Sequence, residues 1–143
     1  MTAHGLVEHP LIRRLLVLDL SADDHVVFGS GPLLAHGLRH RIGDLDVVAR
    51  GAAWQRACAL GVPAVGPLNG APMVHFWGGR IEVSREWISP EWDIDELIDK
   101  ADVIGGVRFA RLEHVLAYKA SLRRPKDVAD LDVLRAYLAA RAS

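Results

Sequence analysis

Two aspartates lie one residue apart at the start of an apolar run, in the sequence Asp44-Leu45-Asp46-Val47-Val48. Successive side chains of a β-strand alternate between faces, so Asp44 and Asp46 would share one face, roughly 7 Å apart along the chain. Two carboxylates on an otherwise apolar strand are costly to bury unless a positive charge offsets them. A divalent cation is the simplest candidate for that charge. The alternative is an edge strand whose carboxylates face solvent.

A glycine-rich turn, Gly29-Ser30-Gly31, follows the apolar run that ends at Phe28. We expect a helix to begin at this turn, because Gly31 and Pro32 suit a helix start. Backbone N–H groups and the Ser30 hydroxyl could then bind phosphate oxygens, since glycine allows a phosphate to approach closely. The turn and the aspartates together predict a site for a nucleoside triphosphate and its metal. Taken alone, such a tripeptide is more often a plain turn.

The combination of these two motifs resembles the nucleotidyltransferase fold that polymerase-beta-like enzymes share. The family pattern is a hydrophobic residue and Gly-Ser, then roughly ten to fifteen residues, then Asp-hydrophobic-Asp-hydrophobic. Here Gly29, Ser30, Asp44 and Asp46 occupy its glycine and polar positions. Segment 34–46 is similar to small bacterial members, including AbiEii-like toxin–antitoxin and abortive-infection nucleotidyltransferases. The resemblance implies an α+β fold, with a small mixed β-sheet flanked by helices and a C-terminal helical pair.

The resemblance also implies a two-metal mechanism, in which Asp44 and Asp46 hold Mg²⁺ (or Mn²⁺) on the triphosphate. It places a third acid on a neighbouring strand, and Glu82 is our candidate, at a position where family members more often carry Asp. Glu82 lies between Ile81 and Val83, so its side chain would point away from their face of the strand. We expect Glu82 to help bind the second metal or to deprotonate the acceptor hydroxyl. The alternative is an exposed charge on a hairpin.

Three cationic residues are further candidates for contacts with phosphate or acceptor. Arg39 and Arg41 lie just before the aspartates, and an arginine can bind two phosphate oxygens at once. The alternative for this pair is a solvent-exposed helix end, where the helix dipole favours cations. Lys119 lies in a segment similar to the helical tail of the small bacterial members, which implies that it reaches the nucleotide. Otherwise it is a surface lysine.

Hydrophobic periodicity and turn residues predict the elements of the first half of the chain. We expect a helix over 9–20, a strand over 25–28, a helix from 31 to about His40, a strand over 44–49 and a helix over 51–60. These elements would place the glycine turn and the two aspartates at the ends of neighbouring strands.

Glycine and proline dominate segment 61–72, which predicts a loop with at most a short strand. For the remainder we expect a β-hairpin over 74–84 with a two-residue Gly78-Gly79 turn, an acidic helix over 93–99, an extended segment with a turn over 103–109, and helices over 111–122 and 126–140. Apolar residues at helical spacing indicate that the last two helices pack together. We predict one domain over 1–143, with a core at about 10–110 and a helical tail at about 111–140.

The chain has 143 residues, half of them hydrophobic, and a formal net charge of -1. This length can bury the core of one ordinary domain. The balanced charge gives no overall attraction to nucleic acid or to an anionic membrane, so any nucleic-acid contact would have to be local. The single cysteine, Cys58, is expected to be a small buried residue of a helix.

Neither a secretory signal pattern nor a stretch of roughly 20 apolar residues is present in the sequence. We therefore expect a cytoplasmic protein that does not enter a membrane.

The resemblance, with the site residues of the family pattern present, implies an enzyme that transfers a nucleoside monophosphate from an NTP to a hydroxyl acceptor and releases pyrophosphate. A tRNA end, a protein side chain or a small molecule could be the acceptor, as different relatives suggest. A homodimer or a cognate partner protein could complete the cleft, because the chain leaves little room for an acceptor domain. The alternative is a non-catalytic nucleotidyltransferase-fold binding protein, such as an antitoxin or a regulatory partner. The presence of all three acids favours the enzyme.

Overall fold

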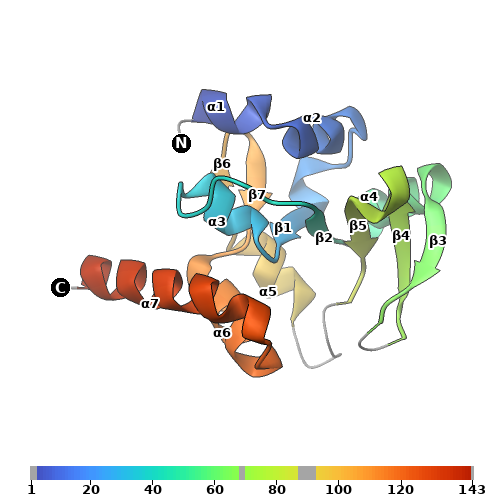
Figure 1. Ribbon diagram of the computed structural model, residues 1–143. Coiled ribbons are helices and arrows are strands. Elements are labelled where there is room, and N and C mark those ends of the chain that lie inside the picture. Colours follow the sequence, from blue (N-terminus) through green and yellow to red (C-terminus); the bar gives the residue numbers. More distant parts are fainter. Residues whose placement is uncertain (1–2, 68–69, 87–92, 143) are drawn as a thin grey trace.

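The computed structural model describes residues 3–67, 70–86 and 93–142. Within these residues the chain forms a mixed seven-stranded β-sheet and seven α-helices, which confirms the predicted α+β class (Figure 1). The helices are α1 (Ala3–Glu8), α2 (Pro10–Val17), α3 (Gly31–Ala35), α4 (Gly51–Leu60), α5 (Ile94–Asp99), α6 (Leu112–Leu122) and α7 (Val128–Ala142). The strands are β1 (His25–Phe28), β2 (Leu45–Ala49), β3 (Val62–Val65), β4 (Pro72–Phe76), β5 (Ile81–Ser84), β6 (Asp102–Ile104) and β7 (Val107–Phe109). None of the helices that the structure describes combines the length and apolar character needed to cross a membrane.

The sheet has the strand order β3-β4-β5-β2-β1-β7-β6, with β5, β2 and β1 at its centre. β1 and β2 are antiparallel, whereas β2 and β5 are parallel. One row of paired residues therefore crosses the sheet, consisting of Phe28 on β1, Asp46 on β2, Glu82 on β5 and His75 on β4. Residues directly opposite one another share a face of the sheet, so this row brings Asp46 beside Glu82.

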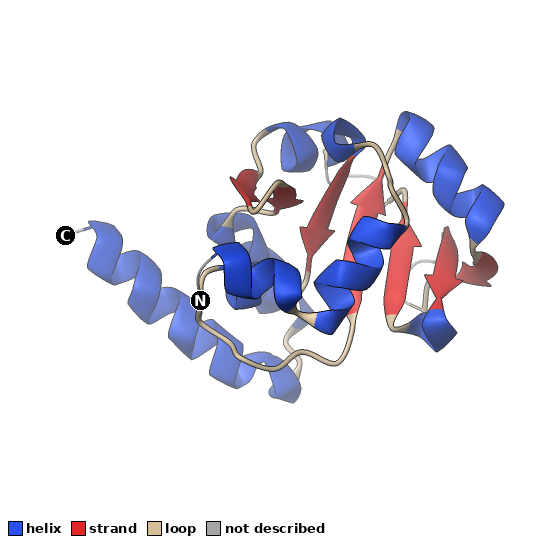
Figure 2. Ribbon diagram, turned by 90° about the horizontal axis from the view of Figure 1, so that it is seen from above, coloured by secondary structure: helices blue, strands red, loops and turns tan. Residues whose placement is uncertain are grey.

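Helices cover both faces of the sheet (Figure 1). On one face, Val27, Val47 and Val83 form a core with residues of α1, α2 and α4. On the other face, Phe28 and Val48 pack with residues of α5, α6 and α7. Because the central strands are covered on both sides, most of their residues are apolar, and a carboxylate among them needs a specific reason. Figure 2 shows the C-terminal half of α7 extending away from the sheet.

Most predicted elements are present, with ends that differ by no more than three residues. The helix after the glycine turn is an exception, because α3 ends at Ala35 and does not reach His40. Gly37 adopts a φ of 73°, and the N–H of Leu38 donates to the Leu33 carbonyl at 2.8 Å. This bonding closes the helix in the manner of a glycine C-cap. As a result, Arg39 and the residues up to Asp44 form a loop instead of a helix end.

The hairpin over 74–84 is present as β4 and β5, but its predicted two-residue turn is wrong. Phe76 pairs with Ile81, so the turn consists of the four residues between them. Trp77 has a positive φ, as do Gly78 and Gly79, and the chain therefore turns over three left-handed residues instead of two. Segment 61–72 contains the short strand β3, in agreement with the prediction, and residues 68–69 of that segment lie outside the described part.

The prediction that Cys58 is buried is also wrong, because its side chain is exposed on α4. Ala53 and Ala57 form the buried face of this helix, and a residue that immediately follows Ala57 points about 100° away from it. α1, at the N-terminus, was not predicted.

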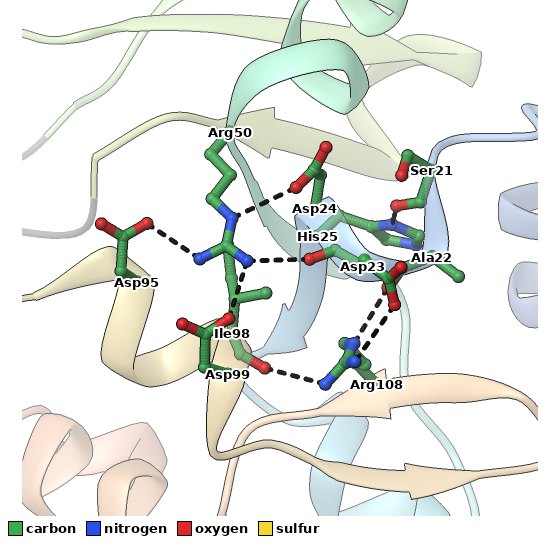
Figure 3. Close-up of polar contacts among 10 residues, drawn as sticks. All are labelled: Ser21, Ala22, Asp23, Asp24, His25, Arg50, Asp95, Ile98, Asp99 and Arg108. Atoms are coloured by element: carbon green, nitrogen blue, oxygen red, sulfur yellow. Dashed lines mark hydrogen bonds and ion pairs between the residues drawn. The ribbon is translucent and has the colours of Figure 1, made fainter.

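Arg50, at the end of β2, connects four acidic residues at one end of the sheet (Figure 3). Its guanidinium donates to Asp24 at 3.3 Å, to Asp95 at 2.8 Å and to Asp99 at 2.7 Å. It also donates to the carbonyl of Asp23 at 3.0 Å. Two of these carboxylates belong to α5, so Arg50 fastens that helix to the sheet.

We expect Arg50→Ala to lower the stability of the protein and to expose the amides of α5 to hydrogen exchange, because several charge-assisted hydrogen bonds are lost together. The effect should shrink in high salt, since the partner carboxylates of α5 are mainly exposed. Chemical denaturation and amide exchange measure both effects. Arg135→Ala, on the exposed side of α7, is the matched control. A loss of stability equal to that of the control would contradict the role of Arg50.

Candidate functional site

The predicted site residues gather where the end of β1 meets the start of β2 and β5. Phe28, the last residue of β1, pairs with Asp46 of β2, and Asp46 pairs with Glu82 of β5. Gly29 directly follows Phe28 and therefore lies beside this row of paired residues. Glu82 lies on the opposite face of β5 from Ile81 and Val83, which are buried in the core. Asp44 precedes β2 by one residue and is exposed.

The three acids influence one another electrostatically. Asp46 is half-buried, and this burial raises its pKa to about 7 together with the charges of Asp44 and Glu82 and a hydrogen bond with Glu82. The charge of Lys119 acts in the opposite direction. The sequence analysis predicts that a charged carboxylate on this strand is costly to bury, and the raised pKa of Asp46 agrees with that prediction. His75 Nε2 lies 3.4 Å from Glu82 Oε1 and is a neighbour that the sequence did not predict.

The acidic side chains of the site offer a divalent metal part of a coordination shell. Within the described residues, no group of three or more His, Cys, Asp or Glu side chains is arranged to hold a metal ion by itself. Mg²⁺, however, is commonly bound by one or two carboxylates and completes its shell with substrate phosphates and water. Asp46 together with Asp44 or Glu82 offers oxygen ligands of this kind. A cation would also relieve the repulsion that raises the pKa of Asp46.

Gly29 and Gly31 have steric roles in the site. Gly29 has a φ of 66°, and a Cβ at this position would lie 2.6 Å from Asp46 Oδ2. A side chain at Gly29 would therefore displace the central carboxylate. A Cβ at Gly31 would overlap the side chain of Val27, so this glycine allows α3 to pack against β1.

Ser30 lies at the centre of a polar network that joins distant segments. Its Oγ accepts from Arg39 Nη1 at 3.0 Å and from Lys119 Nζ at 3.3 Å, and it donates to Asp130 Oδ2 at 3.5 Å. Arg39 reaches Ser30 because α3 ends early and the chain turns back. Arg41 is exposed, and its carbonyl accepts from Arg39 Nε at 3.0 Å.

Lys119 is buried, with 4% of its side chain exposed, so its alternative interpretation as a surface lysine is wrong. Its Nζ lies 3.1 Å from Asp127 Oδ1 and 3.3 Å from Asp130 Oδ2. Asp127 also accepts from Arg124 Nε at 2.6 Å. Burial by itself would raise the pKa of Asp127, but the hydrogen bonds from Arg124 and Lys119 outweigh it and hold that pKa below its usual value.

A cavity of about 230 Å³ opens between the acids and the cations. Six predicted residues line it, namely Gly29, Ser30, Arg39, Asp44, Asp46 and Lys119. Three other predicted residues, Glu82, Gly31 and Arg41, are not in its lining. The cavity thus combines carboxylates that suit a metal with cations and a hydroxyl that suit phosphate.

Four residues of the lining that the sequence did not predict come from the C-terminal tail, namely Tyr118, Arg124, Lys126 and Asp127. Tyr118 packs edge-to-face on Phe28, with ring centroids 5.2 Å apart, and burial raises its pKa to about 12. The sequence does carry a signal for the two acids of the tail, Asp127 and Asp130. They recur at helical spacing with Leu134, so the three residues are predicted to share one helix face.

No protein-family model matches the chain, and neither the curated proteins nor the solved structures contain a significant match.

Proposed function

We propose that the chain is a nucleotidyltransferase-fold protein that binds a metal–triphosphate complex. More particularly, it is a metal-dependent nucleotidyltransferase that moves a nucleoside monophosphate from an NTP to a hydroxyl acceptor. The observation that carries the proposal is the shared cavity, which is lined by Asp44 and Asp46 together with Ser30, Arg39 and Lys119. This arrangement matches the charges of the ligand, because a triphosphate is strongly negative and its bound Mg²⁺ is positive.

Asp46 would hold Mg²⁺ with Asp44 or Glu82, and the metal would supply charge stabilisation to the phosphates. Lys119 and Arg39 would bind phosphate oxygens, since both are cationic hydrogen-bond donors that line the cavity. The Ser30 hydroxyl and the backbone next to Gly29 would bind the same tail.

The transfer requires an acceptor hydroxyl aligned with the α-phosphorus. The hydroxyl oxygen forms the new P–O bond while the bond between the α-phosphorus and the bridging oxygen breaks, and pyrophosphate leaves with that oxygen. Glu82, beside Asp46 and accessible from the same face, is the candidate to accept the hydroxyl proton. The acceptor is a tRNA end, a protein or a small molecule with a free hydroxyl.

Calorimetric titration with ATP, GTP, CTP and UTP, each with Mg²⁺, tests the proposal. Metal-dependent binding of at least one NTP supports it. If the folded protein binds none of them, the proposal fails in favour of the non-catalytic alternative.

We expect Ser30→Ala to weaken NTP binding about tenfold while leaving NMP binding nearly unchanged, because Ser30 lies with the cations that would hold the triphosphate tail. Titrations with ATP and with AMP make the comparison. Ser121→Ala, on the exposed side of α6, is the control. Equal losses for ATP and AMP would indicate that Ser30 only maintains the turn.

A further inference from the structure

One carboxylate oxygen, Asp130 Oδ2, lies at the meeting point of the three candidate phosphate-binding side chains. It accepts from Arg39 Nη1 at 2.9 Å and from Ser30 Oγ at 3.5 Å, and it lies 3.3 Å from Lys119 Nζ. These three groups come from the turn after β1, the loop after α3 and the helix α6. Asp130 belongs to the first turn of α7, so a single side chain ties the C-terminal helix to all three segments.

Asp130 contacts these groups from behind the cavity. Its side chain is 10% exposed, and it is not among the residues of the described chain that line the cavity, whereas Ser30, Arg39 and Lys119 are. A bound triphosphate would therefore touch the three donors and not Asp130. This placement distinguishes Asp130 from Asp127, which does line the cavity.

Arg39 depends on this contact for its orientation. Its side chain is 41% exposed and long, so holding it in one conformation costs rotamer entropy unless a fixed partner restrains it. Among the described residues, Asp130 is its ion-pair partner, and Arg39 also donates to the Ser30 hydroxyl and to a carbonyl of its own loop. Lys119, in contrast, keeps Asp127 as a second buried partner.

We propose that Asp130 is a positioning residue for triphosphate binding, which aims Arg39, Ser30 and Lys119 into the cavity and makes the C-terminal helix part of the site. This inference rests on the proposed function. Charge alone does not explain the arrangement, because one oxygen can lie within hydrogen-bond distance of all three donors only at one position. The position of the carboxylate, and not only its charge, therefore sets the affinity.

Asp130→Glu separates position from charge, since it keeps the carboxylate but moves it by one methylene. We expect this variant to bind inorganic triphosphate with Mg²⁺ about tenfold more weakly than wild type in calorimetric titration. Asp130→Asn, which keeps the shape and removes the charge, should also bind more weakly, and it serves if the longer side chain prevents folding. Asp132→Glu, exposed on the same helix, is the matched control and should bind like wild type.

A second measurement distinguishes positioning from general stability. In an Arg39→Met background, Asp130→Glu should lose much of its effect on triphosphate affinity, because the two residues act as a unit. An undiminished effect in that background would overturn the inference, as would wild-type or tighter affinity in both Asp130 variants. Those results would leave the proposed function intact. Absence of triphosphate binding by the wild-type protein would instead overturn the proposed function, and this inference with it.

Discussion

Asp46→Asn is expected to abolish magnesium-dependent NTP binding while making the metal-free protein more stable at pH 8. Binding is lost because the variant removes the negative charge at the centre of the acidic group. Stability is gained because burial and the neighbouring charges of Asp44 and Glu82 raise the pKa of Asp46 to about 7, so its ionised form is unfavourable in the fold. Calorimetric titration of ATP with Mg²⁺ measures the first effect, and chemical denaturation without metal measures the second.

The direction of the pH dependence follows from the raised pKa of Asp46. The folded protein favours the protonated carboxyl, so the stability that this preference contributes is full below the ordinary pKa of 3.8 and is lost as the pH rises through 7. This increase in pKa corresponds to at most about 4 kcal/mol when the group is fully ionised. We therefore expect Asp46→Asn to gain about 1–3 kcal/mol at pH 8 and little at pH 4.

Asp132→Asn, at an exposed position of α7, is the matched control and should change neither binding nor the pH dependence. Wild-type binding of ATP with Mg²⁺ by folded Asp46→Asn would exclude Asp46 as a metal ligand. A variant that is no more stable than wild type at pH 8 would show that the acidic group does not strain the metal-free fold.

The acidic half of the site was largely predictable, because local pattern determines it. The spacing of Asp44 and Asp46 and the apolar residues around them indicate a strand with a polar face, and alternation in the hairpin places Glu82 away from Ile81. The pairing of Asp46 with Glu82 follows from the pattern of neither segment, and only the family resemblance placed the third acid on a neighbouring strand. It depends on β2 lying next to β5, which is a property of the whole sheet.

The cationic half depends on tertiary structure, and the sequence described it less well. Arg39 reaches Ser30 because Gly37 ends α3. The apolar residues of this segment favoured a longer helix, so the glycine was not recognised as its end. Burial of Lys119 requires that α7 turn its acidic residues inward, and propensity does not determine the rotation of a helix. Asp127, which directly precedes α7, and Asp130 in its first turn are the physical reason why a lysine is tolerated there.

Lys119→Met is expected to lower the free energy of unfolding by about 3–5 kcal/mol, because removal of one partner leaves buried carboxylates with too little compensating charge. Asp127 keeps Arg124 and Asp130 keeps Arg39, so the loss should lie near the lower end of this range. Chemical denaturation at pH 7 measures the effect. Lys100→Met, at an exposed lysine that pairs with Glu96, is the control and should cost far less.

The double variant Lys119→Met/Asp127→Asn separates the structural role of Lys119 from its role in binding. It should recover part of the lost stability, because the buried Asp127 Oδ1 that loses its donor Lys119 Nζ no longer belongs to a charged carboxylate, while Arg124, which also loses its ion pair, is partly exposed to solvent. NTP binding, which we expect Lys119→Met to abolish, should remain absent in the double variant, since the cation proposed to bind the phosphates is missing from both. If binding instead returns together with stability, Lys119 supports the cavity only as half of an ion pair, and phosphate recognition then rests on Ser30 and Arg39.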